Sequence, residues 1–352
     1  MKSKIKVGII GCGSIGSVHA EHYGKINDVE LAALCDVLPE KLGELAGRHK
    51  VLKTFLDYHR LLADPEIDAV SVCVPNDLHA PIAIDALKAG KHVMLEKPMT
   101  LNAELAHEIL KARDAAGKVL QLGMVRRQLP ESQIIKEMVG NGRLGSIYHI
   151  RVKTIRRRGI PGLGSWFTTK ARSGGGGLIG IAVHSLDQAM WLAGCWNPTR
   201  VSARVYSKFG SPMQDYHYVA MWAGPPDFNG TFDVDDYAAG LIRFENRATL
   251  SFEAAWACNA EEESSLELLG TRGGIKAGGG KIILRTEMDN RIADVELFYD
   301  KGKPHFQIQL EKFAAAVRGE GKVPATGEEG LVMMRLLDAI YRSSEVNAEV
   351  EL

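Results

Sequence analysis

The chain has 352 residues, enough for two domains of ordinary size, and its formal net charge is zero. Balanced charge gives no electrostatic case for binding nucleic acid or an anionic membrane surface. No apolar run approaches the roughly 18 to 20 residues of a membrane-spanning helix, and the first expected strand leaves no room for a signal peptide. The five cysteines are odd in number and form no Cys-x-x-Cys pair, so we expect reduced core cysteines, no metal site and a cytoplasmic protein.

A glycine turn comes first along the chain. A buried apolar run, 5–10, is followed by Gly11, Gly13 and Gly16, and then by a helical pattern. The first glycine permits a tight turn, the second lets the backbone approach a pyrophosphate, and the third lets the helix pack close to the strand. A pyrophosphate would lie on the helix N-terminus, so the cofactor-binding candidates here are Gly11, Gly13, Ser14, Ile15 and Gly16. A glycine-rich turn of another α/β protein is the alternative interpretation.

An acidic residue closes the next apolar run. Asp36 lies 20 residues after Gly16, where its carboxylate can accept hydrogen bonds from both hydroxyls of the adenosine ribose. The same carboxylate would repel a 2′-phosphate, and the three residues that follow it contain no arginine. We therefore predict NAD as the cofactor, with Lys41 close enough to soften the preference.

Strand and helix patterns alternate up to about residue 123, which indicates a parallel sheet covered by helices on both faces. The expected strands are 5–10, 31–35, 69–74, 92–95 and 119–122, and the expected helices are 17–26, 39–48, 80–89 and 102–116. Ligands of such sheets bind at the carboxyl ends of the strands. Further cofactor-binding candidates at those ends are Pro75, Asn76, His79, Glu96 and Lys97.

Beyond residue 123 strand patterns follow one another with short polar turns, which favours a largely antiparallel sheet in an α+β domain. The expected strands are 147–153, 200–207, 238–244, 248–254, 265–269 and 281–285, and helices at 307–317 and 328–344 end the chain. We therefore expect an α/β Rossmann domain over residues 1–123 and an α+β domain over residues 124–352.

Lys97 is the first candidate for catalysis. It follows an expected parallel strand directly, so its ammonium would point into the crevice where a nicotinamide ring lies, and there it could hydrogen-bond a substrate oxygen and pass a proton. Pro98 restricts Lys97 to an extended backbone, which helps fix its direction. A surface lysine before a helix is the alternative.

His184 is the second candidate. The glycine run 174–177 leads into an expected helix on which Gly180, His184 and Asp187 fall on one face. A histidine is the usual acid or base near neutral pH, whereas the alternative is a core histidine on a domain-packing helix. Asp187 would orient the imidazole or face solvent.

A basic loop with aromatic residues is the third candidate site. Arg157, within the arginine run 156–158, and Trp166 could hydrogen-bond a polyhydroxylated substrate and stack on a sugar face. A solvated basic loop, or a contact between domains or subunits, is the alternative. Arg126, after the last expected strand of the first domain, is a further substrate-binding candidate.

Taken together, these motifs resemble the Gfo/Idh/MocA oxidoreductases, which include glucose–fructose oxidoreductase and inositol 2-dehydrogenase. The resemblance implies a Rossmann domain followed by an α+β substrate-binding and oligomerisation domain with an open, mostly antiparallel sheet. It implies hydride transfer between nicotinamide and a secondary alcohol of a sugar, glycoside or cyclitol, in a homodimer or homotetramer. Lys97 matches the family's catalytic lysine and His184 its catalytic histidine; Gly180, His184 and Asp187 would contact the substrate.

The chain departs from this pattern at one position. The family carries an aspartate one helical turn before the histidine, where this chain has Gly180, and Ala182 replaces the family's glycine. From this departure we predict vacant space beside His184 and an altered choice of substrate. Two alternatives stay open: a redox-neutral NAD-dependent lyase or glycosidase that retains its cofactor, and a nucleotide-binding regulatory paralogue that has lost catalysis.

Overall fold

The structure is a computed structural model that describes residues 4–219 and 221–352. The described residues form two compact units. One runs to Val125 and includes Lys303–Met334, and the other comprises Arg126–Gly302 and Arg335–Leu352. Residues 303–334, which lie between two segments of the second unit in the chain, thus pack with the first. No helix within the described ranges is long and apolar enough to cross a membrane.

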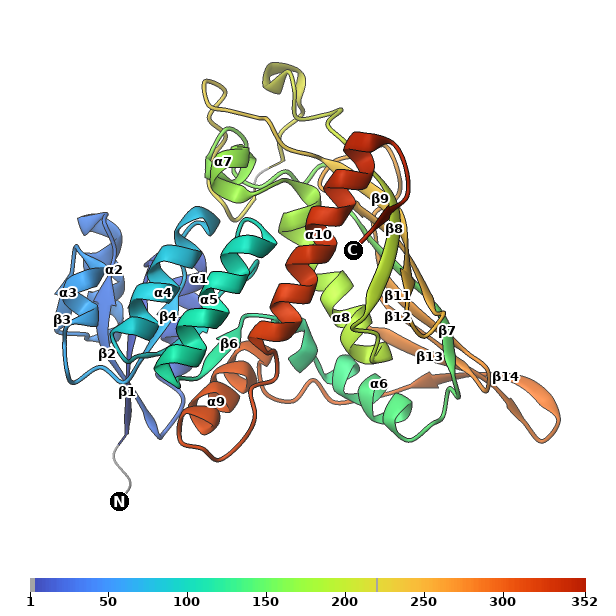
Figure 1. The fold of residues 1–352 in the computed structure, drawn as a ribbon, viewed down its shortest axis with the longest axis horizontal. Coiled ribbons are helices and arrows are strands. Elements are labelled where there is room, and N and C mark those ends of the chain that lie inside the picture. The colour runs from blue at the N-terminus through green and yellow to red at the C-terminus, as the bar shows by residue number, and fades with distance from the viewer. Residues whose placement is uncertain (1–3, 220) are drawn as a thin grey trace. The chain divides into compact units, whose positions relative to one another are not determined.

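The first unit contains a six-stranded sheet in which every pair is parallel, with the order β3-β2-β1-β4-β5-β6 (Figure 1). Its strands are β1 Ile5–Ile10, β2 Val29–Cys35, β3 Lys53–Phe55, β4 Ala69–Val72, β5 His92–Leu95 and β6 Leu120–Leu122. Its helices are α1 Ser14–Tyr23, α2 Pro39–His49, α3 Tyr58–Leu62, α4 His79–Lys88, α5 Ala103–Ala116 and α9 His305–Val317. The parallel Rossmann sheet expected from the sequence is confirmed.

Helix α9 joins this unit through its apolar face. Leu310 and Phe313 belong to the same buried cluster as Val7 and Ile9 of β1 and Tyr23 of α1. Burying a side chain such as Leu or Phe is worth about 1.5–3 kcal/mol. That burial accounts for the return of a segment distant in sequence to the first sheet.

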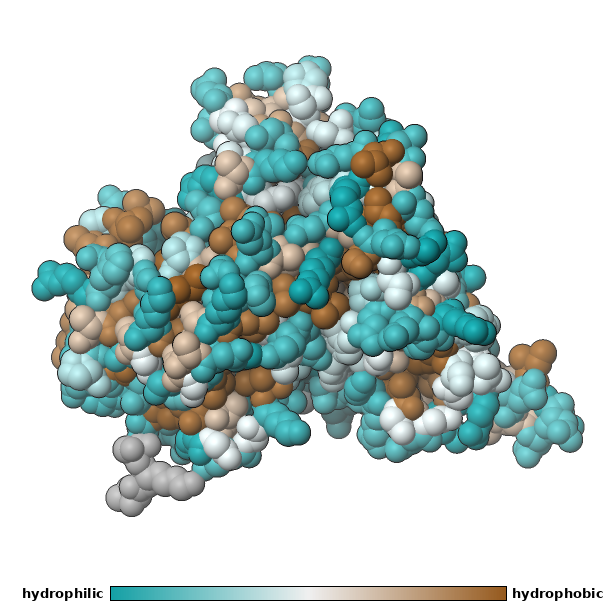
Figure 2. Space-filling model, in the orientation of Figure 1, coloured by the Kyte–Doolittle hydropathy of each residue, from teal (hydrophilic) through white to brown (hydrophobic). Residues whose placement is uncertain are grey.

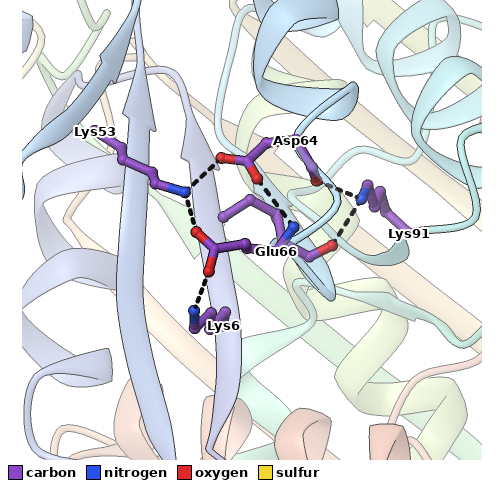
Figure 3. A network of polar contacts seen from close by, with 6 residues as sticks. Lys6, Lys53, Asp64, Glu66 and Lys91 are labelled. Carbon is purple, nitrogen blue, oxygen red and sulfur yellow. Dashed lines mark hydrogen bonds and ion pairs between the residues drawn. The ribbon is translucent and has the colours of Figure 1, made fainter.

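The amino ends of the parallel strands are tied together by charges (Figure 3). Glu66 pairs with Lys6 at 2.9 Å and also with Lys53, which in turn contacts Asp64 at 2.8 Å. Lys91 is buried, and its ammonium donates to two backbone carbonyls of the 64–67 loop at 2.8 Å each. This network fixes the edge of the sheet opposite to the carboxyl ends, where ligands of such folds bind.

The second unit contains a nine-stranded sheet with the order β14-β13-β12-β11-β7-β10-β9-β8-β15. Its strands are β7 Ile147–Ile155, β8 Pro198–Tyr206, β9 Tyr237–Phe244, β10 Thr249–Ala255, β11 Glu263–Gly270, β12 Gly274–Gly278, β13 Lys281–Met288, β14 Arg291–Leu297 and β15 Val350–Glu351. Its shorter helices are α6 Pro130–Gly140, α7 Lys170–Ser173 and α8 Val183–Ala193. Only the β7–β10 pair among these is parallel, so the open, mostly antiparallel sheet is confirmed.

Helix α8 packs against one face of this sheet, over β7 and β11. Ile150 and Val152 of β7 are buried on that face, whereas Arg151 between them is exposed, as expected for a strand covered on one side. The last long helix, α10 Gly327–Val346, begins in the first unit and ends in the second. In Figure 2 teal hydrophilic and brown hydrophobic areas alternate over the face shown, and one of the brown areas lies at the β13–β14 hairpin, where Ile292 is exposed.

Candidate functional site

The turn from β1 into α1 has the shape that a pyrophosphate requires. Gly11 has a φ of +98°, and a Cβ there would collide with the carbonyl of Cys73. A Cβ on Gly16 would collide with the carbonyl oxygen of Gly11, which explains the close packing of helix and turn. A Cβ on Gly13, in contrast, would meet no atom within 4 Å, so open space lies beside this residue.

The N-terminus of α1 is uncapped. Gly13 occupies the N-cap without a side-chain hydrogen bond, and the first turn contains no acidic residue. The amide groups of this turn and the positive end of the helix dipole are therefore available to an anion. Ser14 is exposed and Ile15 half-buried at the same turn. These residues fit the pyrophosphate of a dinucleotide.

Asp36 is held beside this turn by the backbone. Its Oδ2 accepts a hydrogen bond from the Cys12 amide at 2.7 Å, and its Oδ1 accepts one from the Leu38 amide at 2.8 Å. The carboxylate is only half-buried, and each of its oxygens has a further lone pair. Asp36 can therefore accept hydrogen bonds from ribose hydroxyls, as the sequence predicts.

His79 links the turns that follow β4 and β5. Its Nδ1 lies 2.7 Å from the carbonyl oxygen of Pro98, and its Nε2 lies 3.0 Å from that of Val74. Burial lowers the pKa of His79, while the two carbonyls oppose that shift. Both ring nitrogens thus contact backbone, so His79 holds together the two turns that follow these strands, the first of which contains buried Asn76 and half-buried Pro75.

A buried polar chain lies behind Lys97. Glu96 is buried, its Oε2 accepts the Lys97 amide at 3.2 Å, and its Oε1 lies 3.1 Å from Nε2 of His19. His19 Nδ1 lies 3.5 Å from Sγ of Cys73, whose pKa is raised well above its usual value by burial and then by Glu96. The protonated thiol can donate to Nδ1, which leaves Nε2–H to donate to Glu96. These linked contacts fix the Glu96 carboxylate next to the backbone of Lys97, which is half-buried.

In the second unit, a π-helical turn, Leu178–Ala182, leads directly into α8, and His184 lies in the first turn of that helix. Such turns are rare and occur frequently at functional sites. Asp235 anchors the approach: its carboxylate accepts the amides of Gly176 and Leu178 at 2.9 and 2.8 Å and the Tyr341 hydroxyl at 2.6 Å. Side chains on Gly175 and Gly176 would collide with Tyr341 and Asp235, so packing requires glycine at these two positions. The hydrogen bonds to Asp235 hold this segment in place just before the π-helical turn and α8.

Trp256 is the neighbour of Gly180. The indole is buried, and a Cβ built on Gly180 would collide with its Cζ2. The backbone amide of Trp256 donates to the carbonyl of Asp236 at 2.8 Å, which fixes the strand end that carries the ring. The volume on this side of the π-helical turn is thus occupied.

Asp187 lies in an internal ion pair. Arg127 Nε and one of its terminal nitrogens donate to the two carboxylate oxygens of Asp187 at 2.9 and 2.5 Å, and both residues are buried. The Arg127 guanidinium also lies 5.1 Å from the ring centre of Trp196. We predicted Asp187 as a substrate-binding residue. In the structure its carboxylate binds the Arg127 guanidinium, and this ion pair connects α8 to the first residues of the second unit.

The arginine run divides into three environments. Arg158 donates to the carbonyls of Arg157 and Cys258 and is thereby held in place. Arg157 is exposed, as the basic-loop interpretation requires. Arg156 is half-buried, and its side chain forms no ion pair within the described residues.

The aromatic loop is a small cluster. The Trp166 and Phe167 rings stack with centres 3.8 Å apart, and Phe167 meets Trp222 edge-on at 5.2 Å. Trp222 is 61% exposed, so this cluster offers an apolar surface to solvent. Aromatic faces of this kind can stack on a sugar ring, which keeps Trp166 as a candidate.

Comparisons with known proteins assign the family. Residues 5–124 match a family described as oxidoreductases with an NAD-binding Rossmann fold, and residues 132–276 match the Gfo/Idh/MocA C-terminal domain. The chain belongs to the Gfo/Idh/MocA oxidoreductase family. It is 33% identical over 359 residues to the D-glucoside 3-dehydrogenase of Escherichia coli K12, covering 99% of this chain and 98% of the relative. It is 28% identical over 353 residues to the myo-inositol 2-dehydrogenase of Thermotoga maritima, with 99% and 98% covered.

Solved structures support the fold. Levoglucosan dehydrogenase in complex with NADH and levoglucosan has a TM-score of 0.87 to this chain at 24% identity, with 99% of each chain covered. The first unit is an NAD-binding Rossmann domain, and NAD is the cofactor. Within the two described ranges, no three His, Cys, Asp or Glu side chains are grouped to hold a metal ion.

The contact between Gly180 and Trp256 tests one of the predictions made from the sequence. We predicted vacant space beside His184 from the replacement of the family's aspartate by Gly180. That prediction is wrong on the side that a Gly180 side chain would occupy, because the Trp256 indole fills it. Glycine is needed at this position to admit the ring.

Sequence reasoning named Arg156 in the basic loop without choosing it as a site residue, and it assigned no role to four residues that shape the local structure: His19, Asp235, Trp256 and Tyr341. For His19 a signal existed, since it lies one helical turn after Gly16. Nothing local marks Trp256 or Tyr341, because their partners are distant in sequence.

Proposed function

We propose that this chain is an NAD-dependent dehydrogenase of a secondary alcohol in a sugar, glycoside or cyclitol. The observation that carries the proposal is the uncapped N-terminus of α1, with open space at Gly13 and Asp36 at its side. The relatives named as glucoside 3-dehydrogenase and myo-inositol 2-dehydrogenase support the substrate class. The first unit would bind the cofactor, and the second unit would bind the substrate.

Two side chains would act on the substrate hydroxyl. When bound, NAD supplies the acceptor for the carbinol hydride. His184 takes the hydroxyl proton as general base, and Lys97 donates a hydrogen bond to the same oxygen or relays the proton. Glu96 holds the Lys97 backbone, and the π-helical turn sets the position of His184. Arg157 and Trp166 would contact the rest of the substrate.

The test is a panel of sugars, methyl glycosides and inositols with NAD, followed by the absorbance of the reduced cofactor. Lys97→Ala and His184→Ala should each lower turnover by about 10²–10⁴-fold, because proton transfer is lost, with NADH affinity nearly unchanged. Lys88→Ala and His107→Ala, at exposed positions, serve as matched controls. Unchanged turnover in both site variants would exclude the proposed roles.

Two other outcomes correspond to the alternative functions. NAD binding without turnover on the whole panel would favour a regulatory paralogue. Release of a cleaved product without net reduction of a tightly held NAD would favour the redox-neutral lyase or glycosidase.

We also propose that the chain acts in the cytoplasm as a homodimer or homotetramer. The nine-stranded sheet is open at both edges, and the β13–β14 hairpin exposes Met288 and Ile292. Light scattering on a size-exclusion column would measure the assembly, and a monomer at working concentration would contradict this proposal.

A further inference from the structure

A polar cavity lies wholly within the second unit. It has a volume of about 320 Å³, and its walls include Arg126, Thr154, Ser185, Gln188 and Tyr299. Arg126 comes from the short helical turn Val125–Gln128, Thr154 from the end of β7, and Ser185 and Gln188 from α8. Ligand pockets usually span about 300–1,000 Å³, so this one suits a single small ligand or one arm of a larger one.

The positively charged side chains around the cavity differ in whether they form ion pairs. Lys153 pairs with Glu263, and Lys281 pairs with Glu296, each at 3.3 Å. Arg126 is half-buried, and among the described residues its guanidinium forms no hydrogen bond or ion pair. The charge of Arg126 is therefore the one that the lining leaves uncompensated.

The remaining acid of the lining does not neutralise it. Glu131 accepts a hydrogen bond from the Tyr299 hydroxyl at 3.5 Å and lies beyond ion-pair distance from Arg126. Burial lowers the pKa of Arg126, and the nearby charge of Arg156 lowers it further. Burial also lowers the pKa of Arg156, but Glu262 opposes that shift, so Arg126 is the arginine of this pair whose charge burial leaves without a nearby carboxylate, an arrangement that is costly unless an anion joins it.

An uncommitted hydroxyl lies in the same wall. Thr154 is 5% exposed, and its Oγ1 is buried without a hydrogen-bond partner in the described part of the chain. Ser185 donates to the carbonyl of Ala182 in the preceding π-helical turn, and Gln188 donates to Ser132, so both side chains already donate hydrogen bonds within the protein. Arg126 and Thr154 are thus two partly or fully buried side-chain donors of this lining that form no hydrogen bond within the described part of the chain.

We propose that Arg126 and Thr154 bind an oxyanion group, carboxylate or phosphate, of the substrate, so that the preferred substrate is an acidic sugar or cyclitol. The planar guanidinium matches both groups in a two-point contact, whereas a neutral hydroxyl would leave the charge uncompensated. This inference rests on the proposed function for the sugar itself and adds the acidic substituent to it.

Calorimetry on the NADH-loaded protein, in which substrate oxidation is blocked, tests the binding. The probes are D-glucuronate, D-glucose 6-phosphate and D-glucose at equal ionic strength. The variants are Arg126→Gln, Arg126→Lys and Thr154→Val, with Arg143→Gln as a matched exposed arginine of the same unit. Arg126→Lys keeps the charge, and Thr154→Val keeps the shape, so the test does not depend on one variant folding.

We expect at least one acidic sugar to bind the wild type about 10–100-fold more tightly than glucose, as for a charge-assisted hydrogen bond. Arg126→Gln should abolish that preference, Arg126→Lys and Thr154→Val should weaken it, and Arg143→Gln should retain it. A preference for glucuronate assigns a carboxylate, and one for the phosphate ester assigns a phosphate. Equal binding of acidic and neutral sugars, or a preference that survives in Arg126→Gln, overturns the inference.

Turnover separates this inference from the function on which it rests. Reduction of NAD by neutral sugars, with no gain from an acidic group, would leave the dehydrogenase standing and remove the oxyanion site. Arg126-dependent binding of an acidic sugar, without reduction of NAD by any compound of the panel, would leave the oxyanion site standing and remove the dehydrogenase.

Discussion

The indole ring of Trp256 occupies the space that a side chain on Gly180 would fill. Gly180 belongs to the π-helical turn that precedes His184, so the ring packs directly under the start of the proposed catalytic helix. Restoring the family's aspartate at this position therefore requires the indole to move. Local packing therefore limits which residue this position can hold.

The variant Gly180→Asp should lower the free energy of unfolding by about 1–3 kcal/mol, because it overpacks a filled site. Chemical denaturation measures the change. Gly43→Asp, at an exposed helical glycine with no atom near its Cβ position, is the control. Combining Gly180→Asp with Trp256→Ala should cost less than the sum of the two single changes. Strict additivity would show that the two residues do not compete for space.

The variant Asp36→Asn should reduce discrimination against the phosphorylated cofactor. Asparagine keeps an acceptor for one of the amides that hold Asp36 but removes the charge that repels a 2′-phosphate. We expect the preference for NADH over NADPH to fall about ten-fold or more, as when one partner of a charged contact is removed. Fluorescence titration with both reduced cofactors measures it, with exposed Asp114→Asn as the control. A wild type that binds NADPH as well as NADH would contradict the role of Asp36.

The variant Glu96→Gln should disturb the backbone of Lys97. The carboxylate accepts from the Lys97 amide and faces His19, and an amide in its place must turn its NH₂ toward one of them. We expect the free energy of unfolding to fall by about 1–3 kcal/mol, the cost of an unsatisfied buried group. Turnover should fall while NADH affinity changes little, because the change acts through Lys97. Exposed Glu137→Gln is the control. Equal effects of the two substitutions would show that the loss of one negative charge, and not the contact with Lys97, causes the change.

The variant Tyr341→Phe should loosen the glycine run before His184. It removes a 2.6 Å hydrogen bond to Asp235, which is worth about 1.5–3 kcal/mol for a charged acceptor. Exposed Tyr148→Phe is the control.

The same residue gives a pH dependence. Burial, and then Asp235, raise the pKa of Tyr341 well above its usual value. Above pH about 10 the unfolded chain releases this proton while the folded chain retains it, so the free energy of unfolding should decline as pH rises. Tyr341→Phe should show a shallower decline than the wild type in denaturation at a series of alkaline pH values. Identical slopes would mean that Tyr341 does not contribute.

The sequence by itself determined the parallel first sheet, the glycine turn and the place of Asp36. These features depend on residues close together in the chain, where apolar periodicity and glycine spacing are legible. Short or polar strands were missed: β3 has three residues, and β12 contains glycine at both ends. Such strands are set by their neighbours in the sheet and carry little pattern of their own.

Only the tertiary structure decided what surrounds His184. Asp187 could face solvent, substrate or imidazole on a helical projection, and only the structure shows that it is buried and that Arg127, 60 residues away, pairs with it. Asp235 and Tyr341 are 106 residues apart, and Trp256 reaches Gly180 from the end of another strand. A helical pattern predicts which side chains lie on one face of a helix. The residues that pack against that face belong to distant segments of the chain, so no local sequence pattern identifies them.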